Sequence, residues 1–163
     1  KTTVGETLAD RLGWAFTDTD RLIVDAAGIG IKRMVAEHGW PYFRMQERRI
    51  MQTVCARNRQ VVATGGGIIL DARNVLAMRM SGKIVWLTAS RRTIAKRILD
   101  DDATAGNRPP LTDCGVWDEI ASVLSEREPL YRKAADRVVD TDRETISAIV
   151  DRIVRVLDLS PEP

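Results

Sequence analysis

The sequence predicts a single α/β domain with a mostly parallel β-sheet, and three observations support this prediction. Short apolar segments typical of buried strands alternate with longer segments whose apolar residues recur at helical spacing. A chain of 163 residues is long enough to bury a sizeable core. No internal repeat or low-complexity tract divides it. We therefore expect one three-layer domain over residues 1–159, followed by a disordered tail at 160–163.

The expected strands and helices can be placed from pattern and from the residues that begin and end them. Strands are short β-branched or aromatic runs, expected at residues 14–16, 60–63, 83–87 and 137–140. Helices follow the 3.6-residue period and are expected at residues 3–12, 31–38, 41–57, 71–80, 90–99, 116–131 and 143–157. Gly13 suits a helix C-cap, Pro41 a first helical turn and Ser90 an N-cap.

Residues 100–114 interrupt this pattern. The segment is charged, contains Gly, Pro and Asn, and has no helical or strand period. An irregular segment of about 15 residues inside a compact domain is usually functional. We interpret it as a mobile lid, with a disordered insertion as the alternative.

The charge distribution favours small anionic ligands over nucleic acid. The net charge is only +2, although most of the 25 basic residues are arginine. A nucleic-acid binder usually carries basic blocks and a larger positive excess. The dispersed guanidinium groups suit carboxylate and phosphate groups of small molecules instead.

Composition also restricts the cellular setting and the metal chemistry. No apolar run approaches the roughly 18–20 residues of a membrane span, and no signal peptide is recognisable, so we expect a cytoplasmic protein that does not bind membranes. Two cysteines without C-x-x-C spacing and a single histidine disfavour a structural zinc site and a disulfide framework.

The first residues, Lys1, Thr2 and Thr3, match the end of a phosphate-binding loop. The pattern G-x-x-x-x-G-K-[ST] places lysine and a hydroxyl residue immediately before a helix, as here. The first element that the sequence predicts is a helix. An α/β domain that begins with a helix and has no strand before it would lack one strand in its sheet. We therefore expect a strand and the glycine part of the loop to precede Lys1 in the natural protein.

Two further patterns point to a ligand site. Asp18 and Asp20 follow the strand at 14–16, at the end of the sheet where open α/β folds bind ligands. Their i, i+2 spacing on an extended segment would direct both carboxylates to one side. The alternative is that one of them caps a helix that begins near Arg21.

Three consecutive glycines, Gly65, Gly66 and Gly67, follow the strand at 60–63. Glycine costs about 0.5–1 kcal/mol relative to alanine in regular structure, so three together require a reason. Either something approaches this backbone closely, or a tight strand-to-helix turn imposes conformational demands alone.

Taken together, the chain resembles the shikimate kinases over residues 1–141. Six motifs occur in the order and spacing of that family: Lys1-Thr2-Thr3, Asp18-Thr19-Asp20, Phe43-Arg44 with Glu47, Gly65-Gly66-Gly67, Asn107-Arg108-Pro109, and Arg127-Glu128-Pro129-Leu130-Tyr131-Arg132. The resemblance implies a P-loop kinase fold with five parallel strands. It also implies ATP- and Mg²⁺-dependent phosphorylation of the 3-hydroxyl of shikimate, a step of aromatic amino acid biosynthesis. A monomer is compatible with every feature of the chain.

The resemblance implies roles for the nucleotide-side residues. Lys1 would contact the β- and γ-phosphates of ATP, with Thr3 in the same loop. The Thr2 hydroxyl and Asp18 would hold Mg²⁺, and Arg108 of the lid would stabilise charge on the transferred phosphoryl group. Arg97 would stack on adenine, or else interact with the dipole of its own helix.

It likewise implies roles on the acceptor side. Asp20 would hold the acceptor hydroxyl and is the best candidate base. Arg44 and Arg127 would grip the substrate carboxylate, with Glu47 fixing Arg44 by an i, i+3 contact. The three glycines would lie against the substrate ring, where a Cβ would occupy ligand volume.

Two other functions remain open. One is a P-loop kinase of a different hydroxy acid, such as gluconate, which need not show all of these motifs together. The other is a kinase-like module that binds the ligand without catalysis. A natural start at Lys1 would favour the module, whereas intact Asp20, Arg44, Arg108 and Arg127 argue against it.

Overall fold

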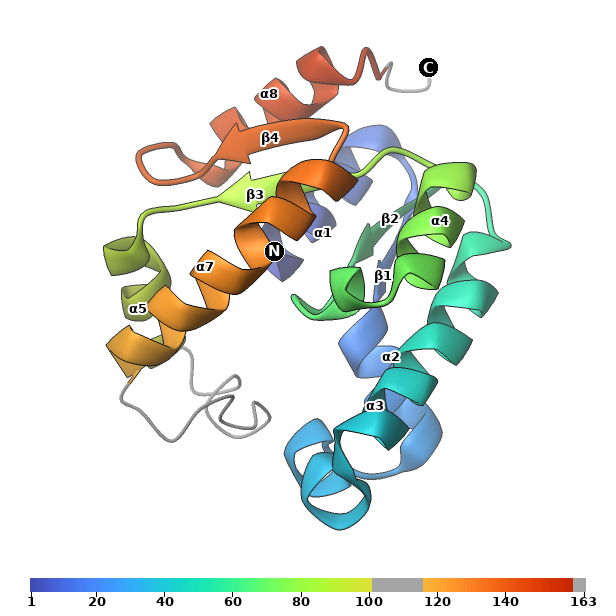
Figure 1. Ribbon diagram of the computed structural model, residues 1–163. Helices are drawn as coiled ribbons and strands as arrows, with labels where there is room; N and C mark the ends of the chain where they lie inside the picture. The colour runs from blue at the N-terminus through green and yellow to red at the C-terminus, as the bar shows by residue number, and fades with distance from the viewer. Residues whose placement is uncertain (101–115, 160–163) are drawn as a thin grey trace.

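The computed structural model describes residues 1–100 and 116–159 and confirms the α/β class (Figure 1). The described strands are β1 (Ala15–Asp18), β2 (Gln60–Ala63), β3 (Val85–Thr88) and β4 (Arg137–Asp140). Each lies within two residues of an expected strand. The expected lid falls almost entirely in residues 101–115 and the expected tail in 160–163, both outside the described residues.

The described strands form two parallel pairs. Ala15 lies opposite Gln60 in the β1–β2 pair, and Val85 lies opposite Arg137 in the β3–β4 pair. Within the described residues neither β2 nor β3 has a second strand neighbour. The count of five strands in one sheet therefore stays a prediction. Interior strands of parallel sheets are normally buried on both faces, yet all four residues of β3 are only half-buried.

Helices surround both pairs of strands (Figure 1). Their bounds are α1 (Thr2–Leu12), α2 (Thr19–Ala27), α3 (Ile31–Cys55), the short 3-10 helix η1 (Ile68–Leu70), α4 (Ala72–Ser81), α5 (Arg91–Leu99), α7 (Val116–Ala134) and α8 (Ile146–Val156). None of the described helices combines the length and the apolar composition of a membrane-spanning segment.

Two helices differ from expectation. The segments expected at 31–38 and 41–57 are merged in α3, but Gly39 has φ 79° and ψ 168°, so the helix axis breaks there and Pro41 lies in the first turn of the second part. Helix α2 was expected only under the alternative in which Asp18 or Asp20 caps a helix that begins near Arg21. It exists, and Asp18 is its N-cap. The assumption that Asp18 and Asp20 share an extended segment is therefore wrong, because β1 ends at Asp18 and Asp20 lies in the first helical turn.

Three buried clusters hold these elements together. One joins α1 to α8 and β4; it consists of Val4, Leu8, Leu12, Val139, Ile149, Val150 and Ile153. A second lies between α2 and α3 and includes Ile23, Met34 and Phe43. In the third, Ile68 and Ile69 of η1 pack on Met51 of α3 and Ala134 of α7. This third cluster fixes the glycine segment between α3 and α7, where the site lies.

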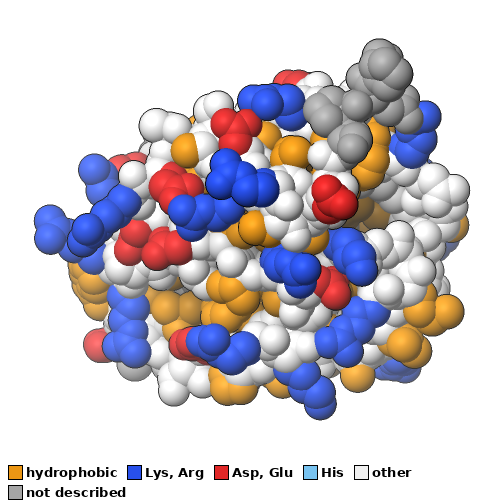
Figure 2. Space-filling view, turned by 90° about the horizontal axis from the view of Figure 1, so that it is seen from above, with side chains coloured by type: hydrophobic (Ala, Val, Ile, Leu, Met, Phe, Trp, Pro, Cys, Tyr) orange, Lys and Arg blue, Asp and Glu red, His pale blue; other side chains and the backbone are white. Residues whose placement is uncertain are grey.

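The face that carries α8 has mixed charge. Figure 2 shows Lys and Arg side chains beside Asp and Glu side chains over much of this face, with apolar side chains between them. Arg152 pairs with Glu144, and Arg11 of α1 pairs with Asp151 at 3.0 Å. The described part of this face thus differs from the single-sign basic surface typical of nucleic-acid binders.

Asp71 joins α3 to α4 and gives a testable contribution to stability. Its carboxylate caps α4 and accepts hydrogen bonds from the side chains of Arg73 and Arg48. The Arg73 side chain first, then its backbone N–H and Arg48, hold the pKa of Asp71 at about 2, below its usual value of 3.8. The stabilisation from the carboxylate is therefore fully present above pH 3.8 and is lost as the pH falls through about 2.

We expect Asp71→Asn to lower the free energy of unfolding by about 1–2 kcal/mol at pH 7, because the charge-assisted bonds to two arginines are weakened. The difference from wild type should vanish as the pH approaches 2. Urea unfolding over a pH series measures both effects. Asp25→Asn, at an exposed position of α2, is the control and should change little. A deficit that stays constant down to pH 2 would contradict the role of the charge.

Candidate active site

Asp18 connects the start of α1 to the start of α2. Its Oδ1 accepts hydrogen bonds from the backbone N–H groups of Asp20 (3.0 Å) and Arg21 (3.2 Å), as an N-cap does. Its Oδ2 accepts a hydrogen bond from the Thr2 hydroxyl at 3.0 Å. The same carboxylate thus caps a helix and lies beside the hydroxyl expected to face the metal ion. The cap and the proposed ligand role are compatible.

The charge of Asp20 interacts with Lys1, expected on the nucleotide side, and with Arg44, expected on the acceptor side. Burial raises the pKa of its carboxyl; the charge of Lys1 opposes this, Asp18 adds to it, and Arg44 opposes it. Asp20 Oδ1 is buried and has no hydrogen-bond partner among the described residues. An unpaired buried acceptor costs about 1–3 kcal/mol, so this atom is poised to accept a hydrogen bond from a ligand.

Arg44 is held on three sides. It donates from Nη1 to Glu47, which is 2% exposed, so the expected i, i+3 contact is present. Burial raises the pKa of Glu47, and the hydrogen bond from Arg44 opposes that rise. The rings of Trp40 and Phe43 each lie 5.2 Å from Arg44 Cζ, within the range of a cation–π contact. The guanidinium group is therefore fixed before any ligand binds.

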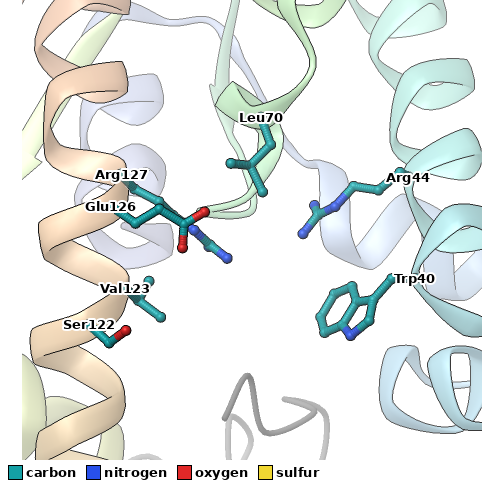
Figure 3. A pocket seen from close by; sticks show the side chains of 7 residues that line it. All are labelled: Trp40, Arg44, Leu70, Ser122, Val123, Glu126 and Arg127. Atoms are coloured by element: carbon teal, nitrogen blue, oxygen red, sulfur yellow. The ribbon is translucent and has the colours of Figure 1, made fainter.

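Arg44 and Arg127 face one cavity from opposite helices (Figure 3). Arg44 belongs to α3 and Arg127 to α7, and Figure 3 shows both guanidinium groups directed into the space between them. The cavity measures about 290 Å³ and is lined by Trp40, Arg44, Leu70, Ser122, Val123, Glu126 and Arg127. Arg127 Nε is buried and has no hydrogen-bond partner among the described residues. The cavity thus offers positive charge and a free donor to an anionic ligand.

The three glycines are approached first by side chains of the chain itself. A Cβ on Gly65 would lie 2.7 Å from Asp20 Oδ1, and one on Gly67 would overlap the guanidinium group of Arg44. A Cβ on Gly66 would lie 3.2 Å from the hydroxyl of Tyr131. Close approach, rather than a turn alone, explains why this segment has no side chains. A direct contact between the glycines and substrate stays a prediction.

The structure describes most, but not all, of the residues that are expected to bind the nucleotide. Lys1 is the residue before α1, with Thr2 and Thr3 in its first turn. Arg97, near the end of α5, donates hydrogen bonds to the hydroxyl and the carbonyl of Thr141, each at 2.8 Å. It thus ties α5 to the end of β4, and its contact with adenine stays a prediction. Arg108 lies outside the described residues.

Sequence reasoning missed two residues of the site. Trp40 lines the cavity four residues before Arg44, and Tyr131 contacts the glycine segment four residues after Arg127. Both follow the i, i+4 rule for one face of a helix, which was available from the sequence. An aromatic residue at that spacing is more often part of a core, so the spacing alone was insufficient.

Comparison with known proteins agrees with this geometry. The family model described as shikimate kinase matches residues 1–158. This chain belongs to the shikimate kinase family. The shikimate kinase of Nitratidesulfovibrio vulgaris is 44% identical over 160 residues, which cover 98% of this chain and 90% of the relative. That of Oleidesulfovibrio alaskensis is 42% identical over 157 residues, covering 96% and 90%.

Solved structures of shikimate kinases have the same fold. The enzyme from Acinetobacter baumannii in complex with shikimate has a TM-score of 0.88 and 29% identity, covering 96% of this chain and 85% of that chain. The enzyme from Aquifex aeolicus has a TM-score of 0.80 and 26% identity, covering 97% and 89%. The P-loop kinase fold expected from the motifs is thereby confirmed.

Proposed function

We propose that this protein phosphorylates the 3-hydroxyl of shikimate with ATP, giving shikimate 3-phosphate and ADP for aromatic amino acid biosynthesis. One observation carries the proposal. Among the described residues, the buried side-chain atoms without hydrogen-bond partners are an acceptor, Asp20 Oδ1, and a donor, Arg127 Nε. A ligand that carries both a hydroxyl and a carboxylate satisfies both atoms, and shikimate is such a ligand.

The carboxylate is assigned to the two arginines. Arg44 and Arg127 direct guanidinium groups into the cavity from opposite sides, and a guanidinium fork matches a carboxylate with two parallel hydrogen bonds. Because Glu47 and two aromatic rings already hold Arg44, little side-chain entropy is lost on binding. The arrangement selects for a planar anion at this end of the site.

The acceptor hydroxyl is assigned to Asp20. Phosphoryl transfer depends mainly on positioning and charge neutralisation, so a carboxylate that orients the hydroxyl is sufficient. The raised pKa of Asp20 also makes it a better acceptor for the hydroxyl proton as the new O–P bond forms. Lys1 would lie on the phosphates of ATP, with Arg108 as a second cation.

Thr2 and Asp18 fit a Mg²⁺ ion. A hydroxyl and a carboxylate 3.0 Å apart are oxygen ligands of the kind that Mg²⁺ takes, and the ion usually adds waters and nucleotide phosphates to one or two such protein groups. When bound, the ion would neutralise charge on the phosphates. We further propose that the enzyme is a monomer and that it works in the cytoplasm.

A coupled assay of ADP release tests the proposal on the full-length natural protein, after its intact mass has been measured. We expect MgATP turnover only when shikimate is present. ADP release is compared with that of two further reactions, one with gluconate as the acceptor and one without any acceptor. Turnover with gluconate would support the alternative kinase, and no turnover with any acceptor would support the non-catalytic module.

A further inference from the structure

The glycine segment aligns three side chains from three helices. A Cβ on Gly65 would meet the side chain of Asp20 of α2, and one on Gly67 would meet that of Arg44 of α3. A Cβ on Gly66 would meet the side chain of Tyr131 of α7. Asp20 and Arg44 have assigned roles in the acceptor site. The third side chain has no assigned role, although it occupies the equivalent place on the middle glycine.

Tyr131 makes a specific contact there rather than filling space. Its hydroxyl donates a hydrogen bond to the Gly66 carbonyl at 2.5 Å. Its ring stacks on Trp86 of β3, with centroids 5.6 Å apart and an interplanar angle of 23°. Burial raises the pKa of the phenol, while the charge of Arg127 and a side-chain hydrogen bond with Arg127 oppose that rise, so Tyr131 also interacts directly with the arginine one turn before it. The ring stack restrains the side chain, and the hydroxyl provides the link to the glycine segment.

This link joins the two walls of the cavity. Arg127 lies four residues before Tyr131 on α7, so the two side chains leave the helix one turn apart. Arg44, on the opposite wall, lies over Gly67, next to the glycine that Tyr131 holds. The separation between the two guanidinium groups in Figure 3 therefore depends on where α7 is attached to the glycine segment.

We propose that Tyr131 is a positioning residue of the acceptor site: by bonding the Gly66 carbonyl it fixes α7, and with it Arg127, relative to Arg44 and Asp20. This inference rests on the proposed function. It assigns the hydroxyl of Tyr131 to the affinity for the acceptor and gives it no contact with the nucleotide.

The first test is Tyr131→Phe, which removes the hydroxyl and keeps the ring on Trp86. We expect the KM for shikimate to rise about 3–10-fold, the effect of one hydrogen bond, with kcat and the KM for ATP changed less than about 2-fold. Tyr42→Phe is a matched control, since Tyr42 is the other tyrosine of the chain and its ring packs on that of His38, with centroids 4.8 Å apart. It should leave all three constants unchanged.

A second variant separates positioning from general stability. In Gly66→Ala the new methyl group would crowd the Tyr131 hydroxyl at 3.2 Å, and φ at Gly66 is outside the left-handed region that excludes alanine. We expect a similar rise in the KM for shikimate. In the Tyr131→Phe background the oxygen is gone, so adding Gly66→Ala should raise the KM less than about 2-fold further.

Each outcome decides the inference. Independent, multiplicative effects of the two substitutions would overturn it, as would equal losses for shikimate and ATP accompanied by a lower melting temperature. A wild-type enzyme that uses shikimate, with an unaffected Tyr131→Phe variant, would overturn the inference and leave the proposed function intact. A wild-type protein that does not use shikimate would overturn both.

Discussion

Asp20→Asn is expected to reduce kcat by about 10²–10⁴-fold and, in the same protein, to raise the melting temperature at pH 7. The activity falls because the amide cannot accept the hydroxyl proton. The stability rises because burial disfavours the charged carboxylate, as its raised pKa indicates, and one of its oxygens has no partner. If the variant gains about 1 kcal/mol, a chain of this size should melt about 2–4 °C higher.

The pH dependence of this gain follows from the sign of the shift. The pKa of Asp20 is higher in the folded state than its usual 3.8, so the folded protein is penalised as the pH rises from 3.8 through the folded pKa, and stays penalised above it. The advantage of Asp20→Asn should therefore be largest at neutral pH and disappear near pH 3.8. Thermal unfolding from pH 4 to 8 measures it, with Asp25→Asn as the control. An inactive variant that melts lower at pH 7 would show that the carboxylate is structural.

Gly67→Ala is expected to raise the KM for shikimate by about 10–100-fold, the effect of losing a charge-assisted hydrogen bond. The backbone of Gly67, at φ −92° and ψ −2°, accepts alanine. The methyl group, however, would overlap the guanidinium group of Arg44. Arg44 must move away from Glu47, which leaves a buried carboxylate unpaired, so the melting temperature should fall as well.

Gly82→Ala is the matched control for this variant. Gly82 follows α4, has extended backbone with φ −177°, and would place its Cβ in open space. Steady-state kinetics and thermal unfolding of both variants test the prediction. Equal behaviour of Gly67→Ala and Gly82→Ala would mean that Arg44 tolerates the methyl group, and that the third glycine serves the turn alone.

Local signals in the sequence predicted much of the fold. Helices α1 and α5 lie within one residue of their expected bounds because Gly13 and Ser90 provide a real C-cap and N-cap. Helix α2 was harder to place, because Asp18 ends a strand and caps a helix with no loop between them. Sequence patterns normally show turn residues between a strand and a helix. Here Asp18 alone connects β1 to α2, so no turn signal marks the start of the helix.

The site was predictable where partners are close in sequence or belong to a shared motif. The pair Arg44–Glu47 follows from helical spacing, and the proximity of Thr2 to Asp18 follows from the family motifs. The bond from Tyr131 to Gly66 spans 65 residues and exists only because η1 packs between α3 and α7. Such a contact depends on tertiary packing, so periodicity and propensity contain no signal for it.

In the described residues the strands form two separate parallel pairs, β1–β2 and β3–β4. Strands β2 and β3 each leave one row of backbone N–H and C=O groups without a strand partner in the described residues. Free edges of this kind are templates for adding a strand. The sequences of β2 and β3, QVVA and VWLT, contain no charge or proline to discourage it. One more strand paired with both would join the two pairs, which packing against α1 now connects, into the single five-stranded sheet that the family resemblance implies.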